Sequence, residues 1–140
     1  MSGRQARIWH SWRSLPGWVQ AWVGLLLVPA NALPFFFLDT WSGRAGALAA
    51  LVVVATNLPI MWVAAGMTRA MSLPHLLAWI PLQIALLLRL LGMAGAEPPS
   101  RAEAALAVLL LAVNGVSLVF DALDSWRWLK GEREVPGAAA

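Results

Sequence analysis

The chain has 140 residues, of which 60% are hydrophobic and only 12% are charged. A soluble domain of this size carries roughly 25% charged residues and cannot bury so much apolar surface, so the composition excludes a water-soluble fold and predicts a lipid environment. The net charge of +3 does not indicate nucleic-acid binding, because the basic residues flank apolar runs and form no basic patch. The absence of cysteine excludes disulfides, thiolate nucleophiles and cysteine-bound metals.

Residues 1–16 combine basic and apolar side chains ahead of the first apolar run. The basic ones are Arg4, Arg7 and Arg13. Ile8, Trp12 and Leu15 share one helical face, which predicts an amphipathic segment at the membrane interface. A cleaved signal peptide is the alternative, but the apolar run that follows is too long for one and contains prolines.

Four apolar segments follow, each of about 20 residues, and this length matches a hydrocarbon core of about 30 Å. We expect spans at residues 17–38, 45–65, 73–93 and 102–123 within a transmembrane domain of residues 17–125, followed by a polar tail at residues 126–140. Residues 39–44 are expected to form the first turn, and Ser72 is expected to cap the third helix. The predicted fold is an all-α membrane protein, an antiparallel bundle of four transmembrane helices with a short amphipathic interfacial segment.

Basic residues are distributed unevenly between the two predicted faces of the membrane. One face holds Arg4, Arg7, Arg13, Arg69, Arg127, Lys130 and Arg133, and the other holds Arg44 and Arg101. The positive-inside rule therefore places both ends of the chain in the cytoplasm. The short, compact design fits a bacterial inner (cytoplasmic) membrane.

Uncharged amide side chains lie inside the predicted spans. They are Asn31, Asn57, Gln83 and Asn114. The last three lie about 14 Å deep, near the bilayer midplane, and Asn31 lies about one turn further out. We expect one hydrogen-bonded layer at the bundle axis. Its favoured role is to clasp the helices, and the alternative is a site for a small solute or ion, as in transporters.

Small and kinking residues shape the predicted spans. Gly46, Ala50, Val53 and Asn57 share one face of the second span, which predicts close approach of a neighbouring helix. Prolines interrupt the spans at positions 29, 34, 59 and 81. Because each proline removes a backbone hydrogen bond, the outer half of the first span is expected to bend or partly unwind.

Charged residues near the span ends are predicted to form ion pairs. Asp121 and Asp124 end the fourth span on the side of Arg69, and the expected pair is Asp121–Arg69. Arg89 lies within the third span, where we expect it to reach the outer surface or to pair with Asp39. Pairing that fixes helix register is the favoured interpretation, and a relay or a charged site is the alternative.

One histidine and one tryptophan in the third span are possible ligand contacts. His75 lies in the first turn, where a neutral, hydrogen-bonded imidazole is expected. Its alternative role is a single axial ligand to a cofactor. Trp79, one turn further, is expected to pack within the bundle or to touch a lipid or cofactor.

The sequence lacks motifs for catalysis and metal binding, including HExxH, G-x-S-x-G and a glycine-rich phosphate loop. We therefore expect no enzyme, no metal and no cofactor. The predicted function is that of a non-catalytic accessory, assembly or scaffold subunit, with the lipid bilayer and other membrane subunits or itself as partners. One alternative is a small-solute or ion transporter or channel component that uses the amide layer. The other is a lipid- or cofactor-binding membrane protein.

Overall fold

The computed structural model describes residues 3–138, and the regular elements within them are all helical. In chain order they are α1 (Gly3–Arg13), α2 (Gly17–Ala21), the π-helical turn η1 (Trp22–Leu27), α3 (Val28–Ala32), the 3-10 turn η2 (Leu33–Phe36), α4 (Trp41–Ala64), the 3-10 turn η3 (Arg69–Met71), α5 (Ser72–Leu90) and α6 (Arg101–Leu129). The prediction of an all-α chain is confirmed for this part of the sequence.

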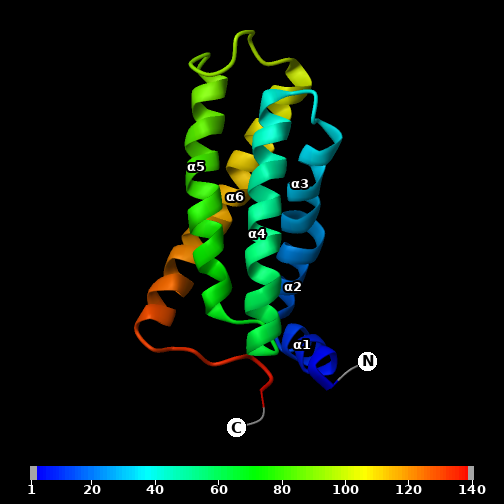
Figure 1. The fold of residues 1–140 in the computed structure, drawn as a ribbon, viewed down its shortest axis with the longest axis vertical. Helices are drawn as coiled ribbons and strands as arrows, with labels where there is room; N and C mark the ends of the chain where they lie inside the picture. Colours follow the sequence, from blue (N-terminus) through cyan, green and yellow to red (C-terminus); the bar gives the residue numbers. More distant parts are fainter. Residues whose placement is uncertain (1–2, 139–140) are drawn as a thin grey trace.

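Four helical segments are long and apolar enough to cross a membrane, as the sequence predicts. They are Gly17–Phe36, Trp41–Ala64, Arg69–Leu90 and Arg101–Leu129. The segments lie side by side along the long axis of the molecule, and the loops that join them lie at its two ends (Figure 1). The short helix α1 lies at the end where α4 stops and α5 begins (Figure 1).

Large apolar side chains cover the outside of these segments. Leu25, Val63 and Leu77 belong to three different segments and are 79%, 80% and 78% exposed. Soluble monomers rarely expose contiguous apolar patches larger than a few hundred Å². This surface therefore suits contact with lipid chains and not with water.

The buried apolar contacts lie mainly between α5 and α6. The core cluster consists of Ala49, Trp79, Leu82, Leu86, Leu106, Ala107 and Leu110. Next to it, α4 comes close to its neighbours at Gly46, where a Cβ atom would lie 2.8 Å from Pro34 Cγ and 3.0 Å from Leu110 Cδ1. The predicted close packing along the small-residue face of the second span is confirmed at this position.

The prolines of the first span change its helix type and do not unwind it. Pro29 has no N–H, so the carbonyl four residues earlier loses its regular donor, and the turn that precedes it, Trp22–Leu27, is π-helical. The second proline, Pro34, lies in the 3-10 turn Leu33–Phe36 that ends the segment. The segment thus stays helical as far as Phe36, so the expected partial unwinding of the outer half is wrong, while the expected bend stays a prediction.

The first predicted turn is shorter than expected, because α4 already begins at Trp41. The Thr40 hydroxyl accepts a hydrogen bond from the Gly43 N–H at 3.0 Å and caps the helix. A Cβ atom at Gly43 would overlap the backbone carbonyl of Phe37. Glycine at this position thus lets the chain pass directly from the first span into α4.

The third and fourth spans also differ from prediction at their ends. Ser72 does not cap α5, because the turn Arg69–Met71 leads directly into it and Thr68 accepts the hydrogen bond that begins this turn. The Ser72 hydroxyl instead donates to a carbonyl of the same turn at 2.6 Å. At the other end of the chain, α6 continues to Leu129, because no glycine or proline interrupts the first residues of the predicted tail.

Candidate functional site

A buried ion pair joins α5 and α6 near the loop between them. Arg89 Nε lies 2.9 Å from Glu103 Oε1, and Arg89 Nη2 lies 3.0 Å from Glu103 Oε2, with the two side chains 6% and 5% exposed. The N–H and the hydroxyl of Ser42, at the start of α4, both donate to Glu103 Oε1 at 3.0 Å. We call Ser42, Arg89 and Glu103 the ionic clamp, because together they tie three of the spans.

The remaining donor group of Arg89 holds the loop that follows α5. Arg89 Nη1 donates to the backbone carbonyls of Ala94 and Glu97. The expected pairing of Arg89 with Asp39 is therefore wrong, since Glu103 and the loop carbonyls take up its donors. Sequence reasoning missed Glu103, although Ser100 three residues before it makes the S-x-x-E pattern that marks a helix start.

Two of the four predicted amides bond to each other between the first and last spans. Asn31 Nδ2 donates to Asn114 Oδ1 at 2.7 Å, and Asn114 Nδ2 donates to Asn31 Oδ1 at 3.0 Å. Asn114 is fully buried. One turn along α6, Ser117 accepts a hydrogen bond from Trp22 Nε1 at 3.0 Å and adds a second contact to the first span.

The other two amides take different partners, so the expected single layer of four amides does not form. Gln83 Nε2 donates to the carbonyls of Leu110 and Leu111 in α6, at 3.5 and 3.3 Å. Asn57 bonds to His75. The four amides therefore form one mutual pair and two separate contacts.

A cluster of four side chains joins α4, α5 and α6 toward the end that carries α1. We call Asn57, His75, Trp79 and Asp121 the histidine cluster. His75 Nε2 lies 3.0 Å from Asn57 Nδ2, and His75 Nδ1 lies 3.0 Å from Asp121 Oδ1. Because an amide nitrogen only donates, Nε2 accepts and the Nδ1–H group donates to the carboxylate. Trp79 stacks on the imidazole, with ring centroids 4.3 Å apart and planes inclined by 10°.

Three polar atoms of this cluster have no partner. Among the described residues, the buried side-chain polar atoms without a hydrogen bond are Asn57 Oδ1, Trp79 Nε1 and Asp121 Oδ2. Leaving such a group unpaired costs about 1–3 kcal/mol, so native proteins leave few of them and each calls for an explanation. All three atoms belong to side chains that are linked to one another through contacts with His75. This concentration makes the histidine cluster the candidate functional site.

The expected ion pair Asp121–Arg69 is wrong, because His75 takes the Asp121 carboxylate. Arg69 Nε lies 3.3 Å from Asp124 Oδ1, and a longer contact of 3.8 Å reaches Glu132 Oε2 beyond α6. These charges are partly exposed, so the pair contributes little to stability beyond fixing the position of η3 against α6.

The histidine cluster offers hydrogen-bonding atoms that its own side chains leave unused. Both nitrogens of His75 are engaged, by Asn57 and Asp121, and among the described residues no hydroxyl bonds to the ring as a nucleophile would. Within the same residues, no three histidine, aspartate or glutamate side chains gather as metal ligands would. The unpaired atoms are two acceptors and one donor, which suit a small molecule with two donors and one acceptor.

Comparisons with protein-family models, with curated proteins and with solved structures give no match to this chain.

The ionic clamp generates a prediction about stability. Replacing Glu103 by Gln leaves the buried guanidinium of Arg89 without its counter-charge, and removing one partner of a buried pair costs about 3–5 kcal/mol. We expect the Glu103→Gln variant to show a clearly lower free energy of unfolding in detergent, measured by denaturant titration. The matched control is Glu97→Gln in the adjacent loop, where only the backbone carbonyl touches Arg89. Equal stability of Glu103→Gln and the parent would contradict the role given to the clamp.

Proposed function

We propose that the chain is an integral protein of a bacterial cytoplasmic membrane, crossing it as an antiparallel bundle with both ends inside. Support comes from the four apolar helices and from the position of α1 and residues 130–138 at the same end of the molecule (Figure 1). Most basic residues of the chain belong to that end, as the positive-inside rule requires of a cytoplasmic face. Only the α3–α4 and α5–α6 connections then lie outside.

This orientation predicts the accessibility of single cysteines, which can be introduced freely because the chain has none. Glu97 and Glu134 are both exposed glutamates, one in the α5–α6 loop and one after α6. In spheroplasts, a membrane-impermeant maleimide should label Glu97→Cys but should label Glu134→Cys only after lysis. The two variants serve as controls for each other. Labelling of the reverse kind would invert the orientation, and labelling of both before lysis would contradict the single crossing of the membrane by α6 between them.

Within the membrane, we propose a non-catalytic role as an accessory, assembly or scaffold subunit of a larger membrane complex or of a homo-oligomer. The observation that carries this proposal is that polar side chains of the spans bond to other groups of the same chain. Among the described residues, the ionic clamp and the Asn31–Asn114 pair have their donors and acceptors engaged in hydrogen bonds within the chain. The helices are joined by short segments, so little surface projects into water. The surface left for a partner is the apolar exterior, which suits another membrane-spanning helix.

The experiment that tests this role is purification from native membranes in a mild detergent. We expect the 15.1 kDa chain to migrate in an assembly of several times its mass and to carry a fixed set of other membrane proteins, or further copies of itself. Co-expression of two differently tagged copies separates these two cases. A chain that stays monomeric without partners, in detergent and in native nanodiscs alike, would contradict the proposal.

A second candidate function is binding of a small ligand in the histidine cluster, and the three unpaired atoms favour it. A transport site built from the amide layer has less support, because Asn31 and Asn114 satisfy each other and Gln83 bonds to helix backbone. In the histidine cluster, a ligand would donate to Asp121 and Asn57 and accept from Trp79. A cofactor contact through the stacked His75 and Trp79 rings is the other form of this proposal.

Two conservative substitutions test this second candidate. Trp79→Phe keeps the aromatic stack on His75 but removes the indole donor, and Asp121→Asn keeps the shape but changes one acceptor to a donor. Native mass spectrometry of the parent should show a bound small molecule that both variants lose. Asp124→Asn, whose parent side chain pairs with Arg69 outside the cluster, should retain it. A parent protein without any adduct, or an adduct that all variants retain, would end this proposal.

A further inference from the structure

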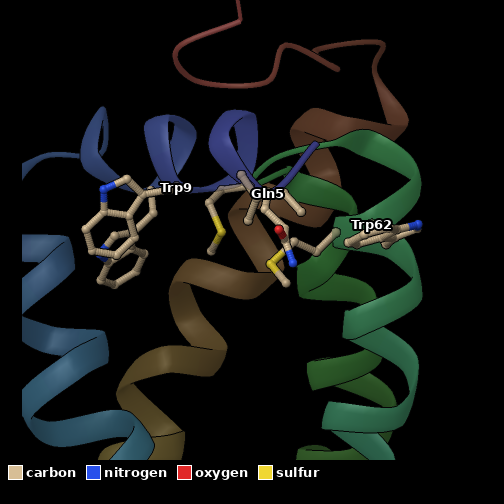
Figure 2. A pocket seen from close by; sticks show the side chains of 7 residues that line it. Gln5, Trp9 and Trp62 are labelled. Atoms are coloured by element: carbon tan, nitrogen blue, oxygen red, sulfur yellow. The ribbon is translucent and has the colours of Figure 1, made fainter. Parts of the chain in front are cut away.

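An apolar groove lies between α1 and the end of α4. It is lined by Gln5, Ile8, Trp9, Trp12, Met61, Trp62 and Met67, with a cavity volume of about 640 Å³. Figure 2 shows α1 lying across the groove, with the side chain of Trp9 on one side and that of Trp62 on the other. Trp9 is 57% exposed and Trp62 is 47% exposed, so the protein leaves much of their apolar surface uncovered.

The helix α1 is held in place over this groove by polar contacts away from its apolar side chains. The Ser11 hydroxyl accepts a hydrogen bond from the Met67 N–H at 2.9 Å, and Ser11 is 2% exposed. His10 Nδ1 lies 3.1 Å from the Gly137 carbonyl, which joins α1 to the segment after α6. The groove is thus a built feature of the fold, with its width set by where these contacts place α1.

The helix beside the groove is basic. The helix α1 contains Arg4, Arg7 and Arg13 and no acidic residue. Among the described residues, none of these arginines belongs to an ion pair. The guanidinium of Arg4 lies 5.4 Å from the ring centroid of Trp62, so one of the positive charges stands directly beside the apolar lining.

We propose that this groove binds an anionic phospholipid of the cytoplasmic leaflet, with an acyl chain along the apolar lining and its phosphate near Arg4. An amphipathic helix with a basic side lies at the depth where acyl chains meet headgroups, and anionic lipids are attracted to basic residues at that depth. A tryptophan that faces the same boundary is typical of interfacial contacts. A zwitterionic lipid would fill the groove equally well but would leave the arginines without a net counter-charge.

The inference rests on the proposed insertion in the membrane, which the cysteine-labelling experiment tests separately. The insertion can therefore be confirmed while the lipid site fails. In that case, labelling gives the predicted pattern and lipid binding shows no preference for charge.

The test is native mass spectrometry of the delipidated protein in detergent, titrated with phosphatidylglycerol or with phosphatidylcholine of identical acyl chains. The parent should retain phosphatidylglycerol more strongly than phosphatidylcholine. Arg4→Gln should weaken retention of phosphatidylglycerol about five-fold, the fold-change that corresponds to about 1 kcal/mol for one arginine near an anionic surface, and should leave phosphatidylcholine unchanged. Ile8→Gln, which makes the lining polar, should weaken both lipids.

The chain offers a matched control at the same end of the molecule. Arg133 stacks over Trp128 with its guanidinium 4.5 Å from the ring centroid, much as Arg4 does over Trp62, but neither residue lines the groove. Arg133→Gln should therefore leave the retention of both lipids unchanged. The proposal is overturned if the parent binds the two lipids equally, if Arg133→Gln matches Arg4→Gln, or if a second copy of the chain occupies the groove as a dimer that added lipid does not displace.

Discussion

Inside a membrane, each buried polar group must find its partner within the protein, and one face of α6 supplies most of these partners. Its residues are Glu103, Asn114, Ser117, Asp121 and Ser125. At 100° per residue, their side chains fall within a sector of about 80°. Through this sector α6 reaches every other span, by bonds to α3, α4 and α5 and to the tryptophan in η1. The apolar contacts between α5 and α6 pack around these polar bonds.

Hydropathy and length were enough to predict the four apolar helices, because an apolar run of 20 residues has few other stable solutions. They did not reveal which side chains would pair. Asp121 and Asp124 are three residues apart on neighbouring helix faces, and both are within reach of Arg69 from the sequence alone. The rotation of α6 decides between them, because it turns Asp121 toward His75 and leaves Asp124 for Arg69.

Glu103 was not predicted as the partner of Arg89, and the cause is similar. Depth along a helix follows from residue number, and on this basis Arg89 was expected within reach of Asp39, but Glu103 was not considered. Glu103 is a single acidic residue in the first turn of a long apolar helix, where it resembles a capping residue. Only the packing of α5 on α6 shows that its carboxylate faces inward to the guanidinium. The four amides were placed at similar depth for the same reason, and their separate partners follow from helix rotation, which periodicity does not fix between different helices.

The two ends of the molecule differ in how completely their polar groups are paired. At the α5–α6 loop, each donor group of Arg89 and both oxygens of Glu103 are engaged. Toward α1, the histidine cluster keeps three unpaired atoms, and the groove beneath α1 keeps exposed tryptophan surface. An unpaired buried polar atom destabilises the fold, whereas exposed apolar side chains occur along the whole molecule, for example at Phe36 and Leu91. The three unpaired atoms therefore set the histidine cluster apart from the ionic clamp, whose donors and acceptors are all engaged.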